Sequence, residues 1–137
     1  MPGKVFLDTN VLSYAQDAGS PDKQRRCREV IAELAASGEG VISTQVMQEF
    51  FVTATSKLGV APLAAKAVIK TFTVFEVVQV SPGLIHDAVD CSILNQLSFW
   101  DSLILAAAAA AGCGIVYTED LQAGQTILGV SVQNPLL

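Results

Sequence analysis

Short apolar runs alternate with longer segments of helical periodicity along the chain. The short runs are rich in aliphatic and β-branched residues, which is typical of strands, and they cover residues 5–8, 40–43, 76–80, 114–118 and, at a sheet edge, 130–133. Apolar positions at helical spacing predict helices between them, over residues 11–16, 21–38, 44–58, 62–73, 82–97 and 98–113. This alternation predicts an α/β domain with a mostly parallel sheet covered by helices on both faces.

Serine–proline pairs and glycines mark several helix ends. Ser20 and Ser81 each precede a proline, the arrangement of an N-cap followed by the first helical residue. Gly38 and Gly59 follow apolar periodic segments and are predicted C-caps. These signals divide the chain into helices of ordinary length.

Length and composition favour one domain over residues 1–137, because 137 residues suffice to bury a single core and 51% of them are hydrophobic. The longest segment without charge or strong polarity, residues 103–116, is shorter than the roughly 20 residues that span a bilayer. The first strand begins too early to leave room for a signal peptide. We therefore expect a cytoplasmic protein that does not enter a membrane.

The sequence predicts that the three cysteines and the tryptophan lie in the core. Cys27, Cys91 and Cys113 are odd in number and lack the spacing of a disulfide framework or a zinc site. Small buried residues are the expected use of all three. Trp100 is likewise predicted to pack in the core rather than to stack on a base.

Charge is unevenly distributed along the chain. All eight Lys and Arg residues lie at or before Lys70, whereas six of the 13 acids follow it and bring the net charge to −5. Nucleic-acid binding normally depends on cationic groups that neutralise phosphates, so composition alone argues against such a substrate unless a cation offsets the acids. A basic cluster at Lys23, Arg25, Arg26 and Arg28 is interpreted as a solvated helix face, with steering of RNA as the alternative.

Four acids from distant segments are expected at one edge of the sheet. Asp8 ends the first strand, Asp120 follows the strand at 114–118, and Asp101 lies in the first turn of the helix that enters that strand. Glu49 is about five residues into a helix that leaves the second strand, which places it only ~7–8 Å from the edge. Ligands of open parallel sheets bind at this carboxyl edge. Converging carboxylates repel one another unless a cation intervenes, and hard oxygen donors favour Mg²⁺ or Mn²⁺.

Each acid also has a plain structural interpretation. Asp8 is equally suited to cap the helix that follows it, and Asp101 completes a Ser-x-x-Asp capping box. Glu49 lies away from the apolar arc of its helix, as an ordinary exposed glutamate does. Asp120 fits a loop position, and Glu119 competes with it as the fourth acid. Only their expected meeting at one edge of the sheet distinguishes these four acids from ordinary capping, surface and loop residues.

The segments that carry these acids resemble a known family. Residues 5–12, 43–50, 98–108 and 117–124 are similar, in order, to the four acidic motifs of PIN-domain ribonucleases, particularly VapC-type toxins. The resemblance implies a three-layer α/β/α sandwich around a five-stranded sheet, endoribonuclease activity dependent on Mg²⁺ or Mn²⁺, homodimerisation, and inhibition by a cognate antitoxin protein. RNA is the implied substrate.

The resemblance also assigns roles to residues of this chain. It implies that Asp8, Glu49, Asp101 and Asp120 are both the catalytic residues and the metal ligands, and that Asn10 and Thr118 support them. A housekeeping RNA-processing nuclease of the same fold and a non-catalytic metal- or protein-binding module are the alternatives. A phosphatase of the haloacid-dehalogenase type is disfavoured, because a second aspartate is missing from Asp8-Thr9-Asn10.

Overall fold

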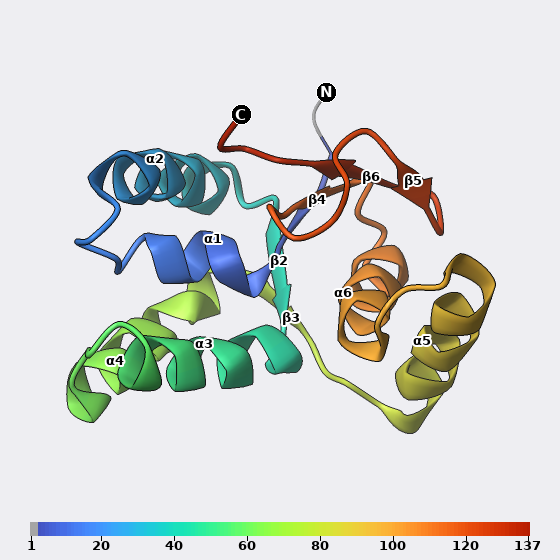
Figure 1. Ribbon diagram of the computed structural model, residues 1–137, viewed down its shortest axis with the longest axis horizontal. Helices are drawn as coiled ribbons and strands as arrows, with labels where there is room; N and C mark the ends of the chain where they lie inside the picture. The colour runs from blue at the N-terminus through green and yellow to red at the C-terminus, as the bar shows by residue number, and fades with distance from the viewer. Residues whose placement is uncertain (1–2) are drawn as a thin grey trace.

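The computed structural model describes residues 3–137 and has a mostly parallel sheet with helices on both faces (Figure 1). Met1 and Pro2, which the domain predicted over residues 1–137 includes, lie outside the described residues. The elements, in chain order, are β1 (Val5–Leu7), α1 (Thr9–Tyr14), α2 (Pro21–Ser37), β2 (Gly40–Ser43), α3 (Thr44–Ser56), α4 (Pro62–Thr71), a 3₁₀ turn η1 (Phe72–Val74), β3 (Glu76–Val78), α5 (Pro82–Asn95), α6 (Phe99–Ala110), β4 (Ile115–Tyr117), β5 (Thr126–Ile127) and β6 (Val130–Gln133).

The sheet has the strand order β3-β2-β1-β4-β6-β5, and all neighbours are parallel except β5 and β6. The predicted α/β class is confirmed, but the predicted number of five strands is wrong by one. The missed strand, β5, has only two residues and shows no periodicity. It forms a hairpin with β6 through Leu128 and Gly129, which both have positive φ as a type I′ turn requires. Leucine is uncommon at such a position, so the sequence carries no clear signal for this turn.

The helices form two layers around the sheet. Helices α1 to α4 lie on one side of it and α5 and α6 on the other (Figure 1). Helix α6 packs directly on β2, β4 and β6, and α5 packs on α6. Residues 102–108 of α6 are all buried, and the small alanine side chains among them allow the sheet and α5 to approach this helix from different sides.

Helix ends follow most of the predicted signals. Gly38 is a left-handed C-cap with φ 74°, and Ser81 accepts a hydrogen bond from the Leu84 amide at 3.2 Å. Ser20 stands at the predicted N-cap, although no side-chain capping bond forms there. The prediction for Gly59 is wrong, because α3 already ends at Ser56 with Lys57 as its C-cap.

Burial confirms the assignment of the cysteines and corrects that of the tryptophan. Cys27, Cys91 and Cys113 are free thiols in buried positions. Trp100, however, is 62% exposed, so its predicted place in the core is wrong. Nearly every residue of α6 is apolar, and periodicity therefore could not show that the first turn of this helix extends beyond the core.

No single helix in the described part of the chain is long and apolar enough to cross a membrane. Helices α5 and α6 reach the required length and hydropathy only when they are joined across a bend of 118°. Most of α6 is buried inside the fold.

Candidate active site

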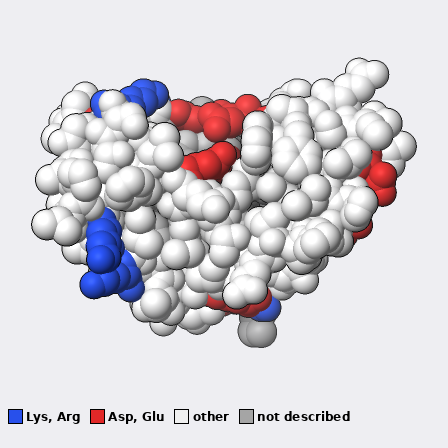
Figure 2. Space-filling model, turned by 90° about the horizontal axis from the view of Figure 1, so that it is seen from below, with Lys and Arg blue, Asp and Glu red and all other residues white. Residues whose placement is uncertain are grey.

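The topology places a crevice where the chain changes direction across the sheet. Strand β1 lies between β2 and β4. The connection from β1 to β2 and the connection that leads into β4 therefore separate at the carboxyl end of β1. A cavity of about 640 Å³ lies at this edge. Figure 2 shows acidic side chains gathered in a hollow of this face. Six acids line the cavity: Asp8, Asp17, Glu49, Asp101, Glu119 and Asp120.

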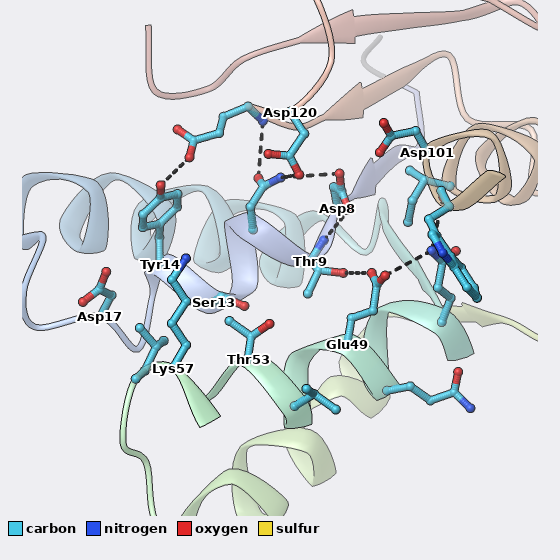
Figure 3. Close-up of a pocket in the computed structure, with 18 residues that line it drawn as sticks. Asp8, Thr9, Ser13, Tyr14, Asp17, Glu49, Thr53, Lys57, Asp101 and Asp120 are labelled. Carbon is cyan, nitrogen blue, oxygen red and sulfur yellow. Dashed lines mark hydrogen bonds between the residues drawn. The ribbon is translucent and has the colours of Figure 1, made fainter. Parts of the chain in front are cut away.

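Asp8 uses its two carboxylate oxygens for different partners. Its Oδ1 accepts a hydrogen bond of 2.7 Å from the Thr9 amide and caps α1 (Figure 3). Its Oδ2 accepts one of 2.8 Å from Thr118 Oγ1. The sheet register explains the second contact, because Leu7 pairs with Tyr117 and the next residues of both strands meet at the edge. The capping interpretation of Asp8 is therefore correct, and it leaves Oδ2 facing the other polar groups of the site.

Burial makes the ionised form of Asp8 unfavourable. The side chain is only 5% exposed, and this desolvation raises the pKa of Asp8 from its ordinary value of 3.8 to about 7. Hydrogen bonds from Thr118 and the Thr9 amide act in the opposite direction, while the charges of Asp120 and Glu49 raise the pKa further. Asp8 is thus a buried carboxyl group whose charged form requires a cation nearby.

Of the two candidates for the fourth acid, Asp120 shares hydrogen-bond partners with Asp8. Asn10 Nδ2 donates to Asp120 Oδ2 at 3.1 Å and lies 3.4 Å from Asp8 Oδ2. Thr118 Oγ1 also accepts a hydrogen bond from the Asp120 amide. Glu119 instead accepts a hydrogen bond from the Tyr14 hydroxyl and forms an ion pair with Lys23 at 3.2 Å. The geometry therefore favours Asp120 over Glu119 as the neighbour of Asp8.

Glu49 reaches the cavity from α3. Its Oε1 accepts a hydrogen bond of 2.7 Å from Thr9 Oγ1, and its Oε2 accepts a weaker one of 3.4 Å from Gln45 Nε2. The side chain is half-buried, so it differs from the ordinary exposed glutamate that its place on the helix suggested. Gln45 Nε2 also donates to the Trp100 carbonyl at 3.2 Å, which ties α3 to α6.

Asp101 enters from the first turn of α6. Its amide donates a hydrogen bond of 3.0 Å to Ser98 Oγ, so Ser98 is the N-cap of α6. The reciprocal bond from the Ser98 amide to the Asp101 carboxylate, which would complete the predicted capping box, does not form. The Asp101 carboxylate is half-buried and lines the cavity. It has no hydrogen-bond or ion-pair partner among residues 3–137, and it is therefore available to a ligand.

The donor set suits a hard divalent cation. Within the described residues, Lys57 is the only Lys or Arg that lines the cavity, against six acids. No three acidic, histidine or cysteine side chains of residues 3–137 lie close enough together to form a ready-made metal cluster. Mg²⁺ needs only one or two protein carboxylates, because it keeps several of its waters. Asp8 and Asp101, with Asp120 and Glu49 beside them, are compatible with that requirement.

Several lining residues escaped the sequence analysis. Thr9 and Gln45 hold Glu49 in place, and Thr53 and Lys57 continue the wall of the cavity along α3. Gln45, Glu49, Thr53 and Lys57 recur at four-residue intervals, which puts them on one helix face. That spacing was visible in the sequence, but only the position of α3 shows which face meets the cavity.

The basic cluster of α2 is engaged in contacts within the chain. Lys23 pairs with Glu119, Arg25 with Asp22, and Arg26 with Glu29. Arg28 donates a hydrogen bond of 2.8 Å to the Ala15 carbonyl. These contacts agree with the interpretation of the cluster as a solvated helix face, since each cation already has a partner.

Comparison with known proteins places the fold. Residues 5–126 match the model of the PIN domain. No curated protein sequence is similar enough to match the chain. A DNA-bound VapBC structure from Salmonella typhimurium superimposes with a TM-score of 0.70 and 22% identity, covering 97% of this chain and 98% of that one. A toxin–antitoxin complex from Klebsiella pneumoniae has a TM-score of 0.70 and 18% identity, with 96% and 98% covered.

A third structure is described as a toxin that cleaves the sarcin–ricin loop. It is VapC20 of Mycobacterium tuberculosis, with a TM-score of 0.64 and 23% identity, and the match covers 85% of this chain and 90% of that one. At these identities the similarity concerns the fold. The family model spans most of the chain and includes all six acids that line the cavity at the sheet edge, the four predicted ones among them. This chain therefore belongs to the PIN-domain family.

Proposed function

We propose that this protein is a divalent-metal-dependent endoribonuclease and the toxin of a toxin–antitoxin pair. The observation that carries the proposal is that four of the carboxylates around one cavity are those of Asp8, Glu49, Asp101 and Asp120, and that buried Asp8 has no ion pair with a lysine or arginine among residues 3–137. Membership of the PIN family and the fold shared with VapC toxins and VapBC complexes support it.

The proposed roles follow from where the side chains lie. Asp8 and Asp101 would hold Mg²⁺ or Mn²⁺ directly or through water, and Asp120 would complete the site. The ion would polarise the phosphodiester and lower the pKa of a water. Glu49, held by Thr9, would orient the attacking water or hold a second ion. Asn10 and Thr118 keep the carboxylates in position through the hydrogen bonds described above.

The expected reaction is hydrolysis by in-line displacement. The water oxygen forms a bond to phosphorus, the bond to the 3′ oxygen breaks, and that oxygen takes up a proton. Because water rather than the ribose 2′-hydroxyl attacks, the products carry 5′-phosphate and 3′-hydroxyl ends. Products that end in 2′,3′-cyclic phosphate would contradict this assignment of the nucleophile.

The proposal includes protein partners and a compartment. The VapBC structures support a cognate antitoxin as the inhibitor of this chain. For the homodimer, the support is an exposed apolar face of α5 that carries Ile85, Val89 and Ile93 at four-residue intervals. Three free thiols suit the reducing cytoplasm. A housekeeping RNA-processing nuclease would use the same site without an antitoxin, whereas a non-catalytic module would bind metal or protein without cleaving RNA.

Cleavage of a mixed structured RNA pool tests the proposal. Purified protein is assayed with Mg²⁺, with Mn²⁺ and with EDTA, alongside Asp8→Asn, Asp101→Asn and the control Asp90→Asn, an exposed acid of α5 outside the cavity. We expect cleavage that needs the metal and falls on the order of 100-fold or more in the two cavity variants, because several kcal/mol of transition-state stabilisation are lost. The control should cleave like the wild type.

Two results would contradict the proposal. Cleavage that persists in EDTA, or in both cavity variants, would show that these carboxylates do not carry the reaction. A wild-type protein that binds no Mn²⁺ by isothermal titration and cleaves no RNA would favour the non-catalytic module.

A further inference from the structure

Trp100 is an exposed aromatic residue at the mouth of the acidic cavity. It is the single tryptophan of the chain, its side chain is 62% exposed, and it lines the cavity next to Asp101. Isolated exposed apolar side chains are common and do not by themselves indicate a function. What distinguishes Trp100 is its place beside a proposed catalytic carboxylate and the support that it receives.

The tryptophan is held in position by its surroundings. Its carbonyl accepts the 3.2 Å hydrogen bond from Gln45 Nε2, and its helix turn is capped by Ser98. The ring of Phe99 packs edge-on against the indole, with centroids 5.1 Å apart and an interplanar angle of 77°. The backbone and one edge of the ring are therefore fixed while much of the indole stays open to solvent. A ligand that binds there immobilises little additional side-chain freedom.

Gln45, which holds the Trp100 carbonyl, has an unpaired acceptor close to this wall. Its side chain is 3% exposed and lines the cavity, and its Oε1 has no hydrogen-bond partner among residues 3–137. Buried polar atoms of folded proteins are almost always paired. Because Oε1 is shielded from solvent, an N–H or O–H group of a nucleotide bound beside Trp100 would reach it only after the Gln45 amide rotates.

Charge explains why an RNA nuclease would need such a platform here. Among the described residues, six acids and a single lysine line the cavity. The negative charge of these acids would repel the phosphates of an RNA strand. Figure 3 shows Lys57 and Asp101 on opposite sides of Asp8 and Glu49, so the one cation lies away from the tryptophan side. Stacking of an unpaired base on an aromatic ring is independent of charge and is worth about 1–3 kcal/mol per base in other proteins.

We propose that Trp100 is the stacking platform of a nucleobase subsite next to the scissile phosphate. The inference rests on the proposed ribonuclease function and adds a residue that binds substrate without taking part in the chemistry. A base reaches the indole face only when it is unpaired. The subsite therefore selects cleavage points in single-stranded segments over those in a continuous duplex.

Intrinsic fluorescence tests the subsite, because Trp100 is the only tryptophan. Asp8→Asn protein, which is not expected to cut, is titrated in Mg²⁺ with a mixed-sequence single-stranded RNA, with the same RNA as a duplex, and with an abasic oligomer of equal length. We expect quenching by the single strand and little by the duplex or the abasic oligomer. Equal quenching by the abasic oligomer would overturn the proposal.

Variants separate substrate binding from structure. We expect Trp100→Ala to raise KM for single-stranded RNA about 5- to 150-fold at nearly unchanged kcat, and Trp100→Phe to recover most of the loss. Leu94→Ala, a truncation of an 80% exposed side chain on α5 outside the cavity, is the control and should match the wild type. Thermal melts should be similar for all three variants, because none of these side chains is buried.

A failure of the subsite proposal and a failure of the nuclease proposal would give different results. If Trp100→Ala cleaves with the wild-type KM, the subsite is wrong and the nuclease proposal stands. If single-stranded RNA binds and quenches the fluorescence but the wild type never cuts it, the nuclease proposal is wrong and the subsite stands. A change of sedimentation mass in Trp100→Ala without any change in RNA affinity would assign the indole to a protein contact and overturn the subsite.

Discussion

Asp8 shows how much a single residue contributes to this site. One carboxylate oxygen caps α1 and the other meets Thr118, so the same side chain starts a helix and anchors the polar network. Thr118 is completely buried, and its hydroxyl donates to Asp8 while it accepts from the Asp120 amide. The Thr118 hydroxyl suits this position because a single oxygen atom both donates and accepts.

The pH dependence of stability follows from Asp8. In the unfolded chain Asp8 ionises near its ordinary pKa of 3.8, whereas the folded, metal-free protein retains the proton until about pH 7. The unfolded state then binds fewer protons between these values, so the contribution of Asp8 to the free energy of unfolding falls as pH rises from about 4 to 7. Asp8→Asn should remove this contribution.

Urea denaturation in EDTA at pH 4.5 and pH 7.5 measures the effect. The difference in free energy of unfolding between the two pH values should be smaller in Asp8→Asn than in the wild type. The comparison cancels the contributions of groups that the substitution leaves unchanged, so the difference between the two proteins reports on Asp8 and on its coupling to Asp120 and Glu49. Identical pH dependence in the two proteins would contradict the assignment of a raised pKa to this group.

At the scale of elements, each helix or strand of the site contributes through one end or one face. Strand β1 and the segment after β4 deliver Asp8 and Asp120 to the carboxyl edge, α3 presents a face with Glu49, and the first turn of α6 presents Asp101. The opposite end of β2 has a purely structural task. There Gly40 lies against the side chains of Phe75 and Leu34, and no larger residue fits without movement.

Gly40→Ala is expected to destabilise the fold without affecting the site. The added Cβ would lie 2.6 Å from a ring carbon of Phe75 and 3.2 Å from Leu34 Cβ, and Phe75 is itself buried. Overpacking of this kind costs about 1–3 kcal/mol. Gly114→Ala is the control, because nothing lies within 4 Å of its added Cβ. Equal urea midpoints for the two variants would show that the close packing around Gly40 is easily relieved.

At the scale of the whole molecule, the site is a convergence of charges that repel one another. Acids from segments more than 110 residues apart in sequence, such as Asp8 and Asp120, are brought together by Asn10 and Thr118. The folded chain keeps them close because the apolar core formed by sheet and helices outweighs their repulsion. A bound cation would relieve that repulsion and stabilise the whole fold.

Metal should therefore raise the melting temperature through the acidic site. Mn²⁺ at about 100 times its Kd adds roughly 2.7 kcal/mol, which corresponds to several degrees for a domain of this size. The shift should be larger at pH 7.5 than at pH 6, because the ion displaces the proton that Asp8 holds up to about pH 7. Asp8→Asn and Asp101→Asn should lose most of the shift, while Asp90→Asn keeps it. An undiminished shift in both cavity variants would place the ion elsewhere.

Local patterns determined the elements, the fold class and the four candidate acids of this protein. Periodicity, Ser–Pro pairs and Gly38 act over a few residues, so they are readable in the chain itself, and the resemblance to PIN-domain motifs identified the family. The sequence pattern did not predict strand β5, because two residues are too few to show a periodicity. The supporting parts of the site, such as Thr9 and Gln45, were missed because their roles depend on contacts with distant segments.

Only the tertiary structure decided how these residues meet. The pairing of Leu7 with Tyr117 brings Thr118 to Asp8, and the hydrogen bonds of Asn10 distinguish Asp120 from Glu119. The exposure of Trp100 depends on where α6 passes the edge of the core, which an almost wholly apolar helix does not reveal in its own sequence. Sequence specifies contacts that are close along the chain, whereas burial, charge repulsion and hydrogen bonding between remote segments exist only after the chain has folded.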